Sequence, residues 1–423
     1  MIVKWTGVEV RALRTEALRR TQREFAEMTG FSEAVIRKWE SRGRTATLTG
    51  QYAAGMDTLF ARLDNAQRMR LQSTLDIPAP TGGTTSADAT YEDPIDIGER
   101  LQQIALSDID DAVSGSFELA LDRILDRYEA IGPHRLARDV IALRRKVEAL
   151  LHRKHRPAKL AELYLLAAKL SGVLGYMSVN QGQFRYAKLY CQEAFALASL
   201  VDDDSLKAWV RGTESFCAYY QGEFRAAAEL ARDGIRISGD GPESIRLYAN
   251  GLARALGKLG DRAGVDAAIG AADSIALDHR VGTGLTAALS FAPYGQARLA
   301  ANAVTAYLSI GQYDRVLELG RPIVELADNS DSAWSRALVG LDLATAVLRH
   351  RARDAEESVH LGIQALTASD DRPIRSVWQR GHELGADLTA MPSGVSQTYL
   401  NFLREWAQAA KPLTAPEDPA PAR

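Results

Sequence analysis

The sequence predicts an all-α protein, in which a small N-terminal helix-turn-helix bundle is joined by a linker to an α-solenoid of stacked helical hairpins. Residues 21–40 have the spacing of two short capped helices around a turn, and a second turn pattern recurs further along the chain between helical segments. A stretch rich in Pro, Gly, Ser and Thr separates the two regions. With 423 residues, of which 46% are hydrophobic, the chain can bury a large core in two or more domains.

The first helices are predicted from their caps. Thr21 followed by Glu24 has the spacing of a capping box, so a helix should begin at about Gln22. Gly30 gives the freedom for a turn, and Ser32 can cap a second helix. We expect the inward faces of the two helices to carry Phe25, Ala26, Met28, Val35, Ile36 and Trp39.

The outer face of the second helix then holds Glu33, Ala34, Arg37 and Lys38. A helix that presents short and long polar side chains from its first two turns can enter a major groove about 12 Å wide, where it can form hydrogen bonds to base edges. This pattern therefore predicts an element that reads DNA. A helical hairpin without DNA contact is the alternative.

This segment resembles the helix-turn-helix of the Cro/repressor-like (XRE-type) bacterial transcription regulators over roughly residues 7 to 70. Val8, Val10, Leu13 and Leu18 match the first helix of that family, TQREFAEMTG matches the second and SEAVIRKWE the third. The resemblance implies a DNA-binding domain over residues 1–75. Ala34 departs from the polar residue often found at its position, which leaves a thymine methyl group as its contact. The predicted DNA-binding residues are Gln22, Ser32, Glu33, Ala34, Arg37, Lys38, Arg42 and Arg44.

Charge favours the same interpretation. Residues 1–75 contain thirteen Lys or Arg and eight Asp or Glu, a net charge of +5, whereas the whole chain carries −3 and the remainder therefore −8. Phosphate contacts need local cations whatever the total charge, and four of the cations cluster around the second helix. A solvated basic face is the alternative.

Residues 76–94 are predicted to be a linker and residues 411–423 a disordered tail, because both are rich in Pro. Cys191 and Cys217 are the only cysteines, too few for a disulfide framework. Charges from Lys4 to Arg14 interrupt any secretory signal, and no uninterrupted apolar run has the length of a membrane span. We expect a cytoplasmic protein without a membrane partner.

A repeated turn organises residues 95–410. It occurs as GQFRYA from Gly182, GEFRAA from Gly222 and GQYDRV from Gly311, with weaker copies from Gly260 and His350. Successive copies start 40, 38, 51 and 39 residues apart. Each joins two apolar-periodic helices of about a dozen residues, for which stacked hairpins are the economical packing.

These segments resemble tetratricopeptide repeats, in which small residues lie where paired helices approach each other. Gly175, Ala187 and Ala194 fall on those positions in the first copy. The segments SVWQRGHELGADL and VSQTYLNFLREWAQ are predicted to be terminal helices that cover the open end of the stack. A generic helical bundle is the alternative.

In such a stack the first helix of each hairpin would line a concave surface. Aromatic side chains beside Asn, Arg and Lys suit an extended peptide or a small anionic molecule, because Asn can bond to peptide groups and Arg can clamp a carboxylate. Ordinary core packing of the aromatics and solvation of the cations is the alternative. The predicted effector-binding residues are Tyr176, Asn180, Trp209, Phe216, Tyr220, Asn250, Arg254, Lys258 and Arg298.

No catalytic, cofactor or metal-binding motif was found; GTGLTA from Gly282 fits a loose dinucleotide pattern, but no βαβ unit surrounds it. The order of the two regions resembles peptide-responsive quorum-sensing regulators and related bacterial regulators, which implies a homodimer and an effector. We therefore expect a sequence-specific transcriptional regulator that is not an enzyme and whose partners are double-stranded DNA and a peptide or small molecule. A tetratricopeptide-like interaction scaffold without sequence-specific DNA binding is the alternative.

Overall fold

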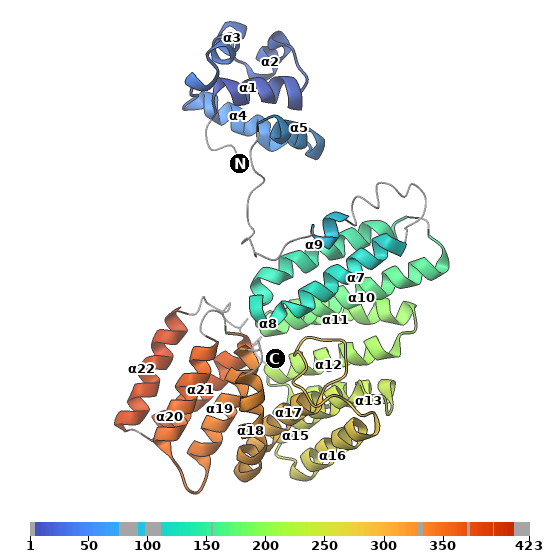
Figure 1. Cartoon of the computed structure of the whole chain (residues 1–423), viewed down its shortest axis with the longest axis vertical. Helices are drawn as coiled ribbons and strands as arrows, with labels where there is room; N and C mark the ends of the chain where they lie inside the picture. Colours follow the sequence, from blue (N-terminus) through green and yellow to red (C-terminus); the bar gives the residue numbers. More distant parts are fainter. Residues whose placement is uncertain are drawn as a thin grey trace, which may run out of the picture. The chain divides into compact units, whose positions relative to one another are not determined.

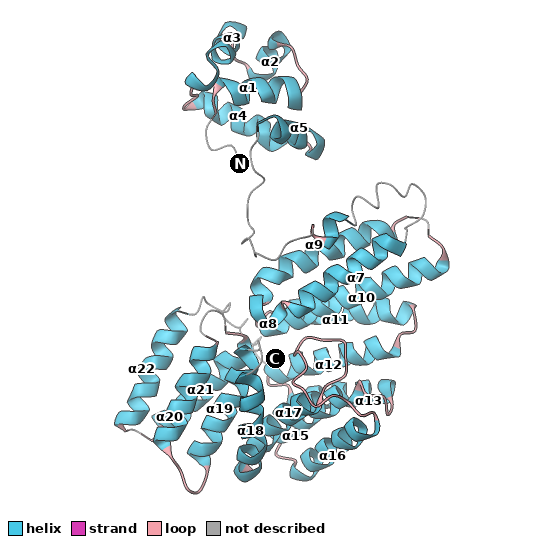
Figure 2. Ribbon diagram, viewed as in Figure 1, coloured by secondary structure: helices cyan, strands magenta, loops and turns pink. Residues whose placement is uncertain are grey.

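The computed structural model describes residues 5–75, 92–97, 111–153, 155–328, 333–369, 373–391 and 393–409. Within these ranges the regular elements are helices, and the β contact found there is an isolated bridge between Thr6 and Thr47 (Figure 2). The predicted all-α class is confirmed. The chain divides into two compact units, Met1–Tyr91 and Glu92–Arg423. Most of the expected linker (76–94) and all of the expected tail (411–423) lie outside the described residues.

The first unit is a small helical bundle around an apolar core. Phe25, Ile36 and Met56 are fully buried in it, together with Val10 and Leu13. Its described elements are α1 (Gly7–Ala12), the π-helical turn η1 (Leu13–Ala17), α2 (Gln22–Thr29), α3 (Glu33–Arg42), the short turn η2 (Gly43–Thr45), α4 (Gln51–Arg62) and α5 (Asn65–Leu75).

Close packing of α1 on α3 depends on Gly7. A Cβ atom at this position would collide with the backbone carbonyl of Trp39, so a residue with a side chain would push the two helices apart. The backbone N–H of Gly7 also donates to the carbonyl of Ala46, at 3.1 Å. These contacts hold α3 and the segment that follows it against α1.

The second unit is a series of helical hairpins that follow one another in chain order (Figure 1). Its described elements are α7 (Asp111–Asp126), α8 (Tyr128–Ile131), α9 (Pro133–Leu151), α10 (Pro157–Asn180), α11 (Phe184–Leu200), α12 (Asp204–Tyr220), α13 (Phe224–Ser238), α14 (Ser244–Arg246), the π-helical η3 (Leu247–Ala253), α15 (Arg254–Lys258), α16 (Arg262–Asp278), α17 (Gln296–Ser309), α18 (Tyr313–Asp328), α19 (Ala333–Arg349), α20 (Ala355–Ala368), α21 (Arg375–Thr389) and α22 (Gly394–Ala409).

All five predicted turns lie between two helices of this series. Gly182, Gly222, Gly260 and Gly311 have φ between +73° and +80°, a conformation that glycine adopts at little steric cost. The helices are longer than the expected dozen residues, and α10 alone has 24. Its Gly175 allows the close approach of α11, because a Cβ atom there would lie 2.9 Å from Cys191 Sγ.

The two ends of the series contact each other. Helix α8 packs against α19, and α10 packs against α21. The rings of Tyr128 and Trp334 are 5.3 Å apart, and the Cδ of Arg375 lies 3.8 Å from where a Cβ of Gly182 would be. The two predicted terminal helices are α21 and α22, the last of the described series, and α21 also contacts α10 of the first hairpin.

An irregular segment, residues 281–295, crosses the inside of the second unit (Figure 2). We call it the 281–295 loop. The Trp209 indole N–H on α12 donates to the carbonyl of Ser290 at 2.7 Å, and the Arg298 Nε on α17 donates to that of Thr286 at 2.7 Å. The backbone N–H of Ala288 donates to Glu129 Oε1, at 2.7 Å. The loop is thus fixed to three separate helices.

Among the described residues, α10 is the one helix with the length and apolar composition of a membrane span. Within its most apolar window, 67% is buried by neighbouring helices of the same unit. The central helix of a soluble domain has these properties too, so α10 is weak evidence for a membrane protein.

Candidate functional site

Helix α2 begins and ends as its sequence predicts, and α3 begins as its sequence predicts. The Thr21 hydroxyl accepts from the backbone N–H of Glu24, whose carboxylate accepts from the N–H of Thr21, so the capping box is complete. Gly30 ends α2 in the left-handed region at φ 72°. Ser32 Oγ accepts from the N–H of Val35 at 3.4 Å, which makes this predicted DNA-contact residue the N-cap of α3.

A network centred on Glu40 fixes α3 against the rest of the first unit. Arg14 donates two hydrogen bonds to the Glu40 carboxylate, at 2.6 and 2.8 Å, and the Gln22 amide donates a third, at 2.7 Å. Burial alone would raise the pKa of Glu40, but the bonds from Arg14 and Gln22 outweigh it and lower the pKa below the usual value. The network therefore favours the charged carboxylate.

The outward face of α3 carries Ala34, Arg37 and Lys38, all exposed. Glu33 is half-buried and accepts a hydrogen bond of 2.7 Å from Arg37 one turn later. Arg42 and Arg44 are exposed just beyond, at the end of α3 and in η2. Among the described residues, no carboxylate forms an ion pair with Lys38, Arg42 or Arg44, so these three cations can take an external anion.

One expectation for this region is wrong, and the structure adds a contact for Gln22. Met28 is 44% exposed and does not face the core, because α2 buries only one side, through Phe25. Gln22 is half-buried, and its amide nitrogen is already bound to Glu40. The Gln22 amide oxygen accepts no hydrogen bond from the described residues.

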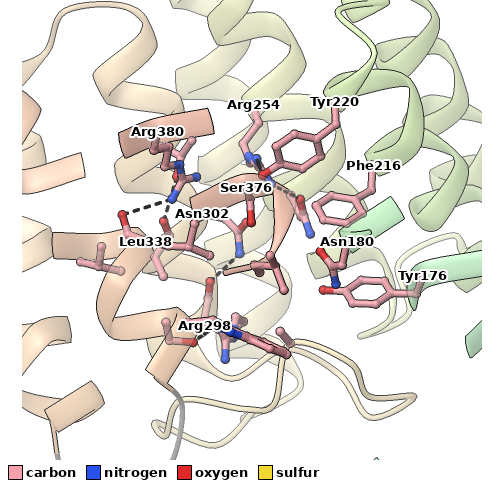
Figure 3. Close-up of a pocket in the computed structure, with 18 of the residues that line it drawn as sticks. Tyr176, Asn180, Phe216, Tyr220, Arg254, Arg298, Asn302, Leu338, Ser376 and Arg380 are labelled. Carbon is pink, nitrogen blue, oxygen red and sulfur yellow. Dashed lines mark hydrogen bonds between the residues drawn. The ribbon is translucent and has the colours of Figure 1, made fainter. Parts of the chain in front are cut away.

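The second unit holds a partly open cavity (Figure 3). Its volume is about 650 Å³, including the part open to solvent. That is room for several waters or for a small organic ligand. The first helix of every hairpin from α10 to α21 contributes side chains, and so do α8 and the 281–295 loop.

Seven of the nine predicted effector residues line this cavity: Tyr176, Asn180, Phe216, Tyr220, Asn250, Arg254 and Arg298. The other two do not. Trp209 is directed to the 281–295 loop, where its ring packs on Phe291 at 4.7 Å. Lys258 lies at the neighbouring opening, with its Nζ 4.0 Å from Glu383.

Part of the cavity lining was not predicted. Ala301, Asn302 and Thr305 lie on α17, beside the predicted Arg298. The rest comes from elements that the closure of the series and the loop bring to the cavity: Tyr128 on α8, Tyr294 and Ala288 in the loop, Trp334, Ser335, Leu338 and Val339 on α19, and Ile374, Ser376 and Arg380 at α21. The 51-residue interval between two turns, against 38 to 40 elsewhere, was a usable signal for the loop.

One wall of the cavity is aromatic. The rings of Tyr176 and Phe216 are stacked, 5.2 Å apart and nearly parallel at 9°, and Tyr220 packs edge-on against Phe216 at 4.9 Å. The Tyr128 hydroxyl accepts a hydrogen bond of 2.6 Å from Asn180. This wall is thus rigid and offers flat apolar surface to a ligand.

Three guanidinium groups reach the cavity, and two of them have a carboxylate partner. Arg298 Nη2 lies 3.6 Å from Glu129 Oε1, and Arg380 Nε lies 3.3 Å from Asp342 Oδ1. Arg380 also donates to the carbonyl of Leu338 at 3.2 Å, as drawn in Figure 3. These two pairs are close to electrically neutral.

Arg254 differs from the other two. It is 4% exposed, and no carboxylate of the described residues forms an ion pair with it. Its Nη1 donates to Asn250 Oδ1 at 2.6 Å, and its Nη2 donates to the Tyr220 hydroxyl at 2.9 Å. Its guanidinium carbon lies 4.3 Å from the ring centre of Tyr219. All of these hydrogen-bond and ring partners are neutral. The buried Asp342 carboxylate also interacts with the Arg254 charge, but its ion pair is with Arg380.

Several buried polar atoms at the cavity have no hydrogen-bond partner. They include Arg254 Nε and Ser376 Oγ, and Ser376 is 2% exposed. Asn250, which supports Arg254, lies in η3, and such π-helical turns often occur at functional sites. A buried donor without an acceptor costs about 1–3 kcal/mol, which a bound acceptor would offset.

Comparison of the chain with models of known protein families finds no match, and comparison with curated proteins finds none either.

Proposed function

We propose that this protein is a sequence-specific DNA-binding transcription regulator. In this proposal the first unit is an XRE-like helix-turn-helix domain that reads DNA through α3. The second unit is a tetratricopeptide-like repeat domain whose cavity binds an effector and changes DNA binding. The protein acts as a homodimer, and no chemical reaction is needed for this role.

The outward face of α3 is the observation that carries the proposal. Its exposed side chains come from a helix that is capped at Ser32 and fixed at Glu40, so they are presented on a rigid support. Lys38 lies on this face, with Arg42 and Arg44 beyond its end. A helix in the major groove can use such residues in two ways: those on its face reach base edges, and those at its end bind phosphates.

Electrostatics supports the choice of DNA over an acidic protein. Binding of cations to phosphates releases counterions, and this supplies much of the affinity for DNA at moderate salt concentration. Residues 1–75 carry a net charge of +5, and among the described side chains of this unit Met28 is the large apolar one that is exposed. An interface with a protein partner would be expected to expose more aromatic and apolar side chains at its centre.

The dimer follows from the size of the unit. A single helix-turn-helix makes few base contacts, whereas two such units on half-sites about one helical turn apart combine theirs. The proposed operator is therefore a sequence with dyad symmetry.

Selection from a random duplex library tests the proposal. Full-length protein is incubated with the library near physiological salt, and bound fragments are sequenced over several rounds. We expect enrichment of a motif with two related half-sites. Equal recovery of all sequences would contradict sequence-specific regulation and would favour the interaction scaffold.

A further inference from the structure

We infer that the cavity of the second unit binds a compact organic anion, with one carboxylate and a flat apolar body, and that it does not bind an extended peptide. This deepens the proposed effector site, and it rests on the proposed function only for its regulatory consequence. Binding itself needs no DNA.

The size of the cavity limits the ligand. An extended peptide needs a groove that is open at both ends, but here α8 and α10 meet α19 and α21. The 281–295 loop contributes Ala288 and Tyr294 to the cavity wall. Hydrogen bonds with Glu129, Trp209 and Arg298 hold the loop in place.

The charge at Arg254 defines the polar end of the ligand. A buried cation without a carboxylate is costly, because its desolvation is not offset by an ion pair. An anionic ligand would supply the missing charge. A carboxylate can accept hydrogen bonds from the donors of the cavity that have no partner, Arg254 Nε, Ser376 Oγ and Arg298 Nη2.

Arg246 provides a comparison within the same unit. It is also buried, and no described carboxylate pairs with it, but its Nη1 donates to the Trp209 carbonyl and its Nη2 to the Thr213 hydroxyl. No nitrogen of Arg246 is left buried without a partner. Arg246 therefore has a complete set of structural contacts, whereas Arg254 keeps a donor for a ligand.

The remaining wall defines the apolar end. Leu338, Val339 and Ile374 face the same space as the stacked rings of Tyr176 and Phe216. A flat body buried among aliphatic and aromatic side chains gains from the hydrophobic effect and from ring contacts. A free inorganic anion would leave this surface empty.

Paired probes that differ only in charge test the inference on the full-length protein without DNA. The probes are phenylacetate, indole-3-acetate, benzoate and hexanoate, each with its primary amide as a neutral control of the same shape. A pool of octapeptides represents the extended class. Affinities are measured by calorimetry for wild type, Arg254→Gln, Ser376→Ala and Lys258→Gln, and circular dichroism checks that each variant is folded.

We expect at least one acid to bind wild type at least about tenfold more tightly than its amide. Arg254→Gln should remove this preference and Ser376→Ala should reduce it. Lys258→Gln removes a positive charge outside the cavity and should bind like wild type. If Arg254→Gln does not fold, Ser376→Ala still tests the site.

The inference is overturned if acids and amides bind alike, or if folded Arg254→Gln or Ser376→Ala binds the acids like wild type. It is also overturned if octapeptides bind and the acids do not, or if no acid binds. DNA is absent throughout, so these failures leave the proposed DNA binding untouched. Conversely, a protein that binds the acids but selects no duplex would retain this site and lose its regulatory role.

Discussion

The side-chain amide of Gln22, at the first turn of α2, donates a hydrogen bond of 2.7 Å to Glu40 near the end of α3. Arg14, from the π-helical turn that follows α1, donates two more to the same carboxylate. One buried acid thus joins three elements of the first unit. The orientation of the proposed DNA-reading helix depends on it.

We therefore expect Glu40→Gln to loosen α3. A folded carboxylate with a lowered pKa stabilises the protein above the usual glutamate pKa of 4.5, and this contribution is lost as the pH falls through the lower folded value. At pH 7 the free energy of opening of α2 and α3 should be about 1 kcal/mol lower in the variant than in wild type. Hydrogen exchange of these helices in the full-length protein measures the difference.

In strong acid the wild-type carboxylate is itself protonated, so the two proteins should become alike there. A difference that stays constant from pH 7 to strong acid would show that Glu40 acts through its shape and not through its charge. Glu27→Gln is the matched control, because that residue is exposed on α2 and pairs only with Arg23.

Gly175→Ala should destabilise the second unit. The added Cβ would lie 2.9 Å from Cys191 Sγ and 3.5 Å from the Ala187 carbonyl, so α10 and α11 must separate. Overpacking of this kind costs about 1–3 kcal/mol. The same substitution at Gly270, in an open part of α16, meets no atom within 4 Å and should stabilise by about 0.5–1 kcal/mol.

Thermal unfolding of both glycine variants gives the comparison. Equal midpoints would mean that the α10–α11 contact is not as close as described. A stabilising Gly175→Ala would point the same way.

Two arginines of the cavity, Arg298 and Arg254, should respond differently to replacement by Met in the ligand-free protein. Arg298→Met leaves the largely buried Glu129 without its cation and should cost about 3 kcal/mol or more. Arg254→Met removes a buried charge that forms no ion pair with a described carboxylate, so the midpoint of chemical unfolding should not fall. A large loss of stability for Arg254→Met would show that this residue is a structural element, as Arg246 is.

Local signals in the sequence were sufficient for both ends of α2, for the start of α3 and for the five turns of the second unit. Thr21, Glu24 and Ser32 act within one helical turn of their own positions, so their effect does not depend on distant parts of the chain. The direction of Met28 was predicted wrongly, because helical periodicity does not tell how wide a face is buried.

Only part of the cavity lining was predicted from the sequence. The inner faces of α10, α12, η3, α15 and α17 follow from the repeat spacing, and seven residues were found in this way. Closure of the series joins Tyr128 to Trp334, and the loop joins Ala288 to Glu129, which is 159 positions away. Such contacts depend on small rotations summed over several hairpins, and no local pattern records them.

Effector and DNA should be coupled. If the acid changes the operator affinity by some factor, the operator must change the acid affinity by the same factor. We expect Arg254→Ala and Asn250→Ala to lose the effector response while their effector-free DNA binding stays intact. Calorimetry with and without operator duplex checks this, and equal acid affinity in both states would exclude the coupling.

Removal of the three unpaired cations tests the central claim most directly. Wild type and the Lys38→Ala, Arg42→Ala, Arg44→Ala triple variant are titrated with the selected duplex over a series of salt concentrations. Loss of Lys38 should cost about 1–3 kcal/mol at the specific site if it reaches a base edge. Loss of the two arginines should weaken binding to all DNA sequences alike. It should also reduce the slope of log affinity against log salt concentration by roughly 2. Equal affinity and equal salt dependence of the two proteins would contradict DNA binding through α3.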